Sequence, residues 1–235
     1  MSLTLIQKEI HSLANPEKAK IFMRFFKTGK GEYAEGDVFL GIIVPTLRGV
    51  AKKYFELSLS DTEKLLHSKY HEERLIALFI LTHQFQKGDE RVQKKVFSIY
   101  LANTRYINNW DLIDLSAPKI VGEFLFQKGK GIALLKKLAR SNLLWDRRIA
   151  VLATFQYIKY NSFKESIEIA EFLLHDTHDL IRKAVGWMLR EIGKRDMAIL
   201  EEFLKKHAHE MPRTMLRYAI EKFDKKKRKE YLSKK

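Results

Sequence analysis

The feature that most constrains this chain is a short pattern that recurs along it at nearly constant spacing. Each copy opens on an arginine followed by apolar or small residues, at Arg74, Arg147, Arg182 and Arg217, so the copies lie 73, 35 and 35 residues apart. The first gap is about twice the others, which predicts a further copy near position 111. Spacings of this size are typical of repeats made of two helices, in which each pair buries its apolar face against its neighbours.

The periodicity of the apolar residues predicts helices along most of the chain. Apolar residues recur at i, i+3, i+4 and i+7, and few segments alternate as a β-strand does. The first helices are expected over 3–13 and 17–26, the second after Asn15-Pro16, a pair typical of an N-cap followed by proline in the first turn. We therefore expect an all-α protein, a right-handed solenoid of HEAT-like helical-pair repeats (α-α superhelix) with a basic concave groove.

The chain is expected to form a single domain over residues 1–235. Within it, 1–45 would hold N-terminal helices and a glycine-spaced loop, 46–222 the repeats, and 223–235 a basic tail. The tail either adds non-specific phosphate contacts or is solvated charge at a frayed terminus. The loop from Gly29 to Asp37 lacks the Lys-Ser/Thr pair of a phosphate-cradling loop, so nucleotide binding there is not expected.

The charge balance favours a polyanionic partner. The chain has 44 Lys and Arg against 29 Asp and Glu, a formal net charge of +15. Nucleic acid is the simplest such partner, and a basic surface without a partner is the alternative. The absence of cysteine excludes disulfides, thiolate chemistry and the usual structural zinc sites. No signal-like N-terminus or membrane-length apolar run is present, so we expect a cytoplasmic protein without membrane contact.

The central copy of the pattern differs from the others. Asp111 stands where the other copies have arginine, and Asp114 stands where they have a small residue. The small residues are Ala77, Ala150, Ala184 and Ala219. A carboxylate at such a position needs a partner or must open onto a cleft, because burying it unpaired is very costly.

The repeated arginines have two interpretations. Stacked repeats would align them into a basic stripe that follows a phosphate backbone, with affinity that falls as salt rises. Alternatively, each arginine covers its own helix with its aliphatic stem. Arg148 lies beside the stripe, three residues after Trp145, and could hold a phosphate or pair with an acid such as Asp114.

The three tryptophans are candidates for contact with a base. Trp110 precedes Asp114 by four residues, so a helix would place both on one face. Trp145 and Trp187 lie in the next two repeats. Aromatic faces stack on bases and attract cations. A core position is the alternative for each, and it is favoured for Trp145.

Two pairs of histidines have a spacing that a metal site on a helix would allow. The pairs are His67 with His71 and His175 with His178. Neither pair has the flanking glutamate of a zinc protease, so we expect surface histidines and no metal site.

Several short motifs, taken in their order and spacing, resemble the AlkD family of HEAT-like-repeat DNA glycosylases, which remove alkylated bases. The resemblance runs over most of the chain. Its motifs are Phe39-Leu40-Gly41-Ile42 with Pro45, Trp110-Asp111 with Asp114 and Pro118, Asn142 with Trp145 and Arg148, and Gly186-Trp187 with Leu189-Arg190-Glu191.

This resemblance implies a function and a set of site residues. The catalytic carboxylate of the family matches Asp114, the tryptophans that embrace the damaged nucleotide match Trp110 and Trp187, and an arginine at the DNA backbone matches Arg148. The implied reaction excises cationic N3- and N7-alkylated purines from duplex DNA, without cofactor or metal, by a monomer that leaves an abasic site. The full set of cations expected to contact DNA is Arg147, Arg148, Arg182, Lys183, Arg190 and Arg217.

One feature leaves other functions open. The loop from Gly29 to Asp37 is longer than the corresponding join in the family, and related branches with an inserted hairpin bind branched DNA with little excision. A non-catalytic binder of branched or damaged DNA is therefore the alternative, and a scaffold for a protein partner is a third. Many glycosylases flip the base into a pocket, whereas the resemblance suggests that the lesion stays stacked.

Overall fold

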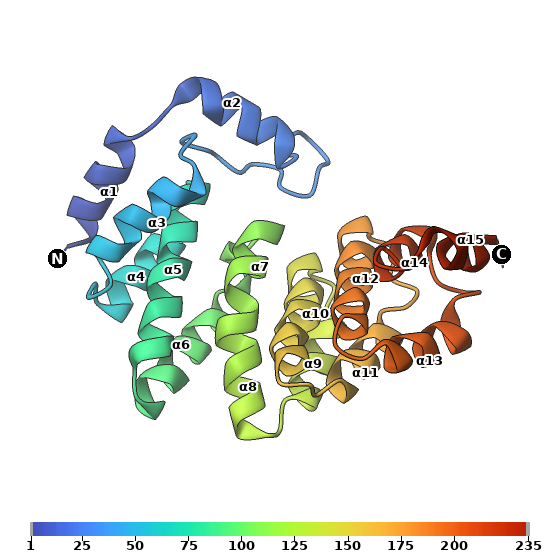
Figure 1. Cartoon of the computed structure of the whole chain (residues 1–235). Helices are drawn as coiled ribbons and strands as arrows, with labels where there is room; N and C mark the ends of the chain where they lie inside the picture. The colour runs from blue at the N-terminus through green and yellow to red at the C-terminus, as the bar shows by residue number, and fades with distance from the viewer. Residues whose placement is uncertain (1, 234–235) are drawn as a thin grey trace. The chain divides into compact units, whose positions relative to one another are not determined.

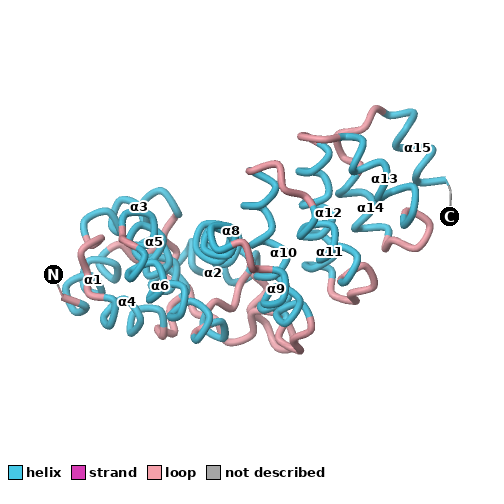
Figure 2. Tube along the Cα trace, turned by 90° about the horizontal axis from the view of Figure 1, so that it is seen from below, coloured by secondary structure: helices cyan, strands magenta, loops and turns pink. Residues whose placement is uncertain are grey.

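The computed structural model describes residues 2–233, and their regular structure is helical (Figure 1). Within these residues, β structure is limited to an isolated bridge between Val38 and Tyr70. Most helices are joined by short loops and turns (Figure 2), and a longer segment, residues 26–43, joins the second helix to the third. The predicted all-α class and its organisation in helical pairs are confirmed.

The chain divides into two compact units at the boundary between Ser116 and Ala117. The single domain expected from the sequence stays a prediction. The helices of the N-terminal unit are α1 (Leu3–Ser12), α2 (Pro16–Phe25), α3 (Val44–Lys53), α4 (Leu59–Leu66), α5 (His71–Lys87), α6 (Glu90–Ala102), the 3-10 turn η1 (Thr104–Tyr106) and α7 (Trp110–Ala117).

The C-terminal unit continues the all-α pattern. It begins with a π-helical turn at Pro118, a residue without the N–H that an α-helix uses. Its helices are η2 (Pro118–Gly122), α8 (Glu123–Lys128), α9 (Ile132–Ala139), α10 (Leu144–Lys159), α11 (Lys164–Phe172), α12 (Asp179–Gly193), α13 (Met197–His207), α14 (Arg213–Ala219) and α15 (Lys225–Ser233).

The start of α2 follows from its sequence. The Asn15 side chain accepts a hydrogen bond of 3.0 Å from the backbone N–H of Lys18, and Pro16 is the first helical residue. The side chain satisfies a donor that the helix itself leaves without a partner. The predicted helix start at Asn15-Pro16 is confirmed.

One inner helix dominates the core of each unit. In the N-terminal unit α5 is buried along most of its length and packs against α3, α4 and α6. In the C-terminal unit α10 is similarly buried and packs against α9, α11 and α12. Both helices are apolar around most of their circumference, which is the pattern of a fully enclosed helix.

The recurring arginine has a structural role inside the repeat. Arg74 and Arg147 each donate from Nη1 to the backbone carbonyl six residues earlier, at 2.9 and 3.0 Å. Arg182 makes the equivalent bond from Nε at 2.8 Å. Each is the fourth residue of its helix, so it satisfies a carbonyl in the turn that precedes that helix. Asp111 is instead the second residue of α7 and makes a different contact.

No helix in the described part of the chain is both long and apolar enough to cross a membrane.

Candidate active site

Helix α7 carries the candidate catalytic residue. Its first residue, Trp110, donates its backbone N–H to the side-chain oxygen of Asn109 at 2.8 Å. Leu112 and Ile113 are fully buried and anchor one side of the helix in the core. Asp114 follows Trp110 by one turn and is only partly buried. The structure therefore places the predicted tryptophan and carboxylate on one helix.

The charge of Asp114 affects the pKa of Tyr100, a buried tyrosine of α6. The Tyr100 hydroxyl shares a hydrogen bond of 2.9 Å with the hydroxyl of Ser116. Burial raises the pKa of Tyr100 far above its ordinary value, and the negative charge of Asp114 raises it further. Tyr100 therefore stays a neutral phenol near Asp114.

The ring of Trp110 packs against two phenylalanines from α2 and the residue that follows it. The Phe26 ring stacks on Trp110 with centroids 5.3 Å apart and an interplanar angle of 23°. The edge of Phe25 meets Trp110 at 6.0 Å and 70°. Sequence analysis did not connect this phenylalanine pair with the site, because the contact joins segments more than 80 residues apart.

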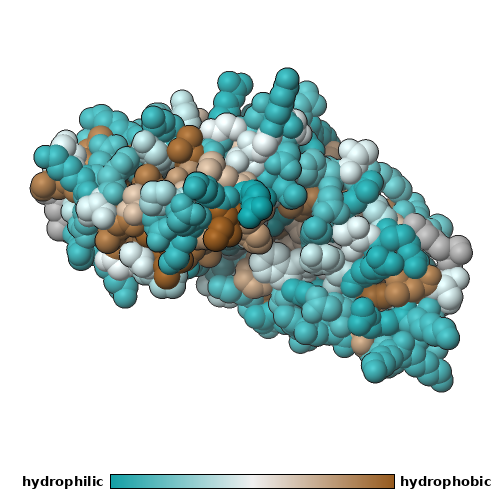
Figure 3. Space-filling model, turned by 90° about the horizontal axis from the view of Figure 1, so that it is seen from above, coloured by the Kyte–Doolittle hydropathy of each residue, from teal (hydrophilic) through white to brown (hydrophobic). Residues whose placement is uncertain are grey.

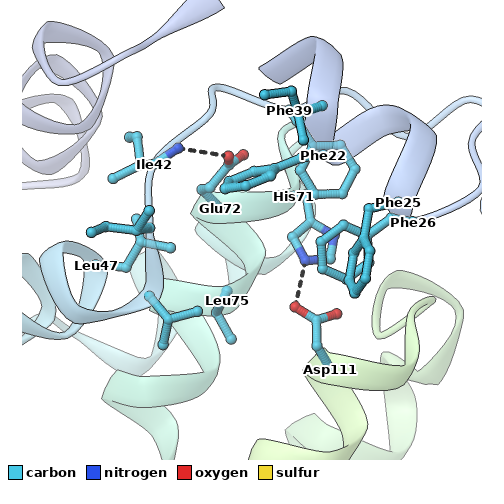
Figure 4. Close-up of a pocket in the computed structure, with 13 residues that line it drawn as sticks. Phe22, Phe25, Phe26, Phe39, Ile42, Leu47, His71, Glu72, Leu75 and Asp111 are labelled. Carbon is cyan, nitrogen blue, oxygen red and sulfur yellow. Dashed lines mark hydrogen bonds and ion pairs between the residues drawn. The ribbon is translucent and has the colours of Figure 1, made fainter. Parts of the chain in front are cut away.

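Asp111, beside Trp110, takes part in a buried ion pair. Its Oδ2 lies 2.9 Å from Nε2 of His71, the first residue of α5 (Figure 4). Burial disfavours the charged imidazolium, but the carboxylates of Asp111 and Asp37 outweigh burial and raise the pKa of His71 to about 9. The expectation that His71 is a surface histidine was wrong, because these two acids let a charged ring be buried.

Asp37 connects the loop from Gly29 to Asp37 with the same ion pair. It accepts hydrogen bonds from Arg74 Nη2 at 2.7 Å and Asn108 Nδ2 at 3.1 Å, and it lies 3.4 Å from His71 Nδ1. Burial alone would raise the pKa of Asp37, but its partners His71, Arg74 and Asn108 lower it below its usual range. The end of this loop therefore holds the start of α5 and the segment before α7.

The next residue of α5 fixes the segment that follows the loop. The buried Glu72 carboxylate accepts backbone hydrogen bonds from Leu40, Gly41 and Ile42 at 2.9, 2.7 and 3.2 Å. Gly41 has a φ of +82°, and a Cβ there would lie 2.1 Å from the carbonyl oxygen of Asn15. Only glycine fits this position, which explains one motif that the sequence analysis singled out.

The other predicted site residues lie in the C-terminal unit, on α10 and α12. Arg148 is 5 % exposed and donates from Nη1 to the carbonyl of Leu180 at 2.7 Å. Arg147 pairs through Nε with Asp176 at 2.8 Å. Trp145 is a core residue, as favoured from the sequence. Contacts of Arg147 and Arg148 with DNA stay predictions.

Helix α12 carries Trp187 among paired charges. The indole Nε1 donates to Glu191 at 3.1 Å, and the ring lies 6.2 Å from Phe155. Arg190 pairs with Glu221 and with Glu191. These contacts orient the indole, which is partly exposed.

The remaining predicted cations differ in their surroundings. Lys183 pairs with Asp179 at 2.7 Å, and the Arg182 side chain donates to the Asp176 carbonyl. Arg217 on α14 is exposed. A role in DNA binding therefore requires least rearrangement at Arg217.

The chain as a whole was compared with known families and structures. A family model described as a DNA alkylation repair enzyme matches residues 6–223. The chain belongs to this family. A match of this extent covers nearly every helix of both units and confirms the resemblance found in the sequence motifs.

Several solved structures are similar to this chain in fold. A "predicted DNA alkylation repair enzyme" from Enterococcus faecalis has a TM-score of 0.69 and 17 % identity, covering 90 % of this chain and 97 % of that chain. AlkD2 from Streptococcus mutans has a TM-score of 0.56 and 18 % identity, covering 94 % and 97 %. The protein smu.31 from Streptococcus mutans UA159 has a TM-score of 0.55 and 18 % identity, covering 94 % and 99 %. No curated protein matches the chain in sequence.

Among the described residues, no group of three or more His, Cys, Asp or Glu side chains is arranged to hold a metal ion. His67, one of the spaced histidines, contacts the Asn103 side chain instead.

Proposed function

We propose that this chain is a DNA glycosylase that hydrolyses the N-glycosidic bond of cationic N3- or N7-alkylated purines and leaves an abasic site. The observation that carries the proposal is Asp114, a partly exposed carboxylate on the same helix as Trp110, in a chain of the DNA alkylation repair family. Its neighbour Tyr100 is a buried, neutral phenol and adds no negative charge beside the carboxylate.

The proposed chemistry follows from charge. An alkylated purine is already cationic and leaves readily, and the sugar gains oxocarbenium character as the bond breaks. A carboxylate near that sugar stabilises charge that appears only in the transition state, and it can position the attacking water. No cofactor or metal is needed for this step.

The aromatic and basic residues have supporting roles in the proposal. Trp110 and Trp187 each offer an aromatic face that attracts a cation such as the alkylated base. Arg217, which is exposed, contacts the phosphate backbone directly, and Arg148 does so after its side chain leaves the Leu180 carbonyl. The other predicted cations add salt-dependent affinity. The net charge of +15 supports duplex DNA as the partner.

The test measures release of 7-methylguanine from methylated duplex DNA. Asp114→Asn keeps the shape of the side chain and removes its charge, so we expect a loss of about 100-fold or more. Asp89→Asn is the matched control, because Asp89 is an exposed N-cap and asparagine caps a helix equally well. Equal release by wild type and Asp114→Asn would remove Asp114 from its role, and no release by wild type would refute the glycosylase.

A second candidate is a binder of branched or damaged DNA without excision. The stacking of Phe26 on Trp110 favours it, because that contact already uses one face of the indole. This function predicts tight, salt-sensitive binding to junctions or bubbles with no abasic product. A preference for plain duplex would count against it.

A further inference from the structure

The N-terminal unit contains an apolar cavity that the proposed excision does not use. Its volume is about 390 Å³. Four phenylalanines and several aliphatic side chains form its walls (Figure 4). Its lining includes Ile21, Phe25, Phe26, Phe39, Ile43 and Val44. The volume falls in the usual range for small-ligand sites, about 300–1,000 Å³.

The rim of this cavity is apolar and open to solvent. Phe25 is 62 % exposed, Ile21 56 % and Ile43 44 %. In the face drawn in Figure 3, apolar residues interrupt the hydrophilic surface over the N-terminal unit. Large apolar side chains clustered at the mouth of a cavity are typical of a binding site.

The floor of the cavity carries carboxylates whose negative charge is only partly compensated. Glu72 is saturated by three backbone N–H groups, and Asp111 is paired with the His71 imidazolium. Oδ1 of Asp111 has no hydrogen-bond partner among the residues that the structure describes. Two carboxylates against one imidazolium repel a phosphate from the floor, whereas a flat, uncharged or cationic ring can enter.

Outside the mouth the charge has the opposite sign. Lys18 and Arg24 are exposed and lie three residues before and after Ile21, which places them on neighbouring parts of the same side of α2. Exposed Lys27 follows shortly after this helix. Cations of this kind bind the backbone of a single strand, while aromatic rings beside them stack on its bases.

We propose that this cavity receives one unstacked nucleobase of bound DNA, with its phosphates held by the cations of α2. The Phe26 ring separates the cavity from Trp110, because it stacks on Trp110 at 5.3 Å and on Phe39 at 5.0 Å. The base would therefore lie apart from Asp114, as an unpaired base of the substrate and not the reacting one. The inference rests on the proposed function only in taking DNA as the ligand.

The experiment compares two duplexes that differ in one unpaired residue. One carries a single bulged adenine, and the other carries an abasic residue at the same bulge. Fluorescence anisotropy at fixed salt gives the affinity of the full chain for each. Stacking in an aromatic cavity predicts that the adenine bulge binds at least about fivefold more tightly. Equal affinities would overturn the proposal.

A variant that fills the cavity tests whether the preference for the adenine bulge arises there. Val44→Phe adds a ring at a lining position and should abolish the preference for the adenine bulge. Leu5→Phe, on an exposed position of α1 outside the cavity, is the matched control and should keep it. A folded Val44→Phe protein that retained the full preference would contradict the assignment of the base to this cavity.

A spectroscopic measurement on wild type keeps the test independent of any variant. A bulged 2-aminopurine should change its fluorescence on binding, because it leaves the neighbouring bases of the duplex and enters an apolar aromatic cavity. Unchanged fluorescence would contradict the proposal. If an apolar dye fills the cavity and leaves DNA binding unchanged, the occupant is a non-nucleotide ligand and the proposal fails.

The Asp114→Asn variant separates the two proposals. It should lose excision and keep the preference for the adenine bulge. If this variant lost the preference for the adenine bulge, the proposal that the cavity binds a base independently of Asp114 would be contradicted.

Discussion

His71 Nε2 lies 2.9 Å from Asp111 Oδ2, and both side chains are buried. This pair joins the first turn of α5 to the first turn of α7, the helix that carries Trp110 and Asp114. Asp37 contacts the other ring nitrogen of His71, so three segments of the N-terminal unit meet at one imidazolium. The position of the candidate catalytic helix therefore depends on a residue that is not part of the chemistry.

His71→Gln should destabilise the N-terminal unit. It removes the cation from a buried network and leaves Asp111 and Asp37 without their shared partner, at a cost of about 3–5 kcal/mol. Urea unfolding measures the change. Asp61→Asn is the control, because its pair with Lys64 is solvent-exposed and contributes little to stability. Equal stabilities of the two variants would contradict a structural role for the buried pair.

The stability of the wild type should fall between pH 6.5 and 9. The folded-state pKa of His71 is raised to about 9 from an ordinary value of 6.5, so its stabilising charge is fully present below 6.5 and is lost as pH rises through 9. The loss is on the order of 3 kcal/mol. Urea unfolding at several pH values measures it. In His71→Gln the fall in the free energy of unfolding between pH 6.5 and 9 should disappear. An identical pH dependence in both proteins would refute the assignment of this fall to His71.

Two glycines with the same backbone conformation should tolerate alanine differently. Gly41 has a φ of +82° with a clash at 2.1 Å for any Cβ, and Gly36 has a φ of +85° with nothing within 4 Å. Both substitutions cost about 1–2 kcal/mol for the left-handed conformation. Gly41→Ala should cost clearly more, because it also moves Asn15 at the start of α2. Thermal unfolding compares the two variants. Equal melting temperatures would show that the backbone around Gly41 shifts to accommodate the added methyl group.

The arginines of the repeat should separate into two groups. Arg182→Ala removes a bond to the Asp176 carbonyl and should lower the free energy of unfolding by about 1–3 kcal/mol. Arg217→Ala, at an exposed position, should leave stability within about 0.5 kcal/mol. Arg217→Ala should also weaken binding to all DNA sequences. The slope of log binding constant against log salt concentration should become shallower by about one. An unchanged salt slope would remove Arg217 from the DNA contacts.

The sequence predicted the features that local rules determine. The start of α2 depends on Asn15 and Pro16, which are adjacent, and the repeat was visible because its arginines bond to carbonyls only six residues away. The core position of Trp145 likewise follows from the helical pattern around it. Such features depend on contacts within one or two helical turns. The spacing of residue types along the sequence indicates contacts of this kind.

The features that the sequence did not predict depend on distant contacts. His71 was expected at the surface because nothing near it indicated that Asp37 and Asp111, 34 and 40 residues away, would surround it. The packing of Phe25 and Phe26 on Trp110 joins segments even further apart. Two acids in the same chain carry different roles for the same reason: Asp111 faces His71, whereas Asp114 stays partly exposed.

The anchoring of the loop from Gly29 to Asp37 has a practical consequence for labelling. Asp37 fixes its end, whereas Lys30 at its tip is exposed. The chain contains no cysteine, so Lys30→Cys would create one attachment point for a fluorophore or spin label. A probe at this position would report changes in the surroundings of the loop tip as DNA is added. The buried ion pairs around Asp37 and His71 would stay intact.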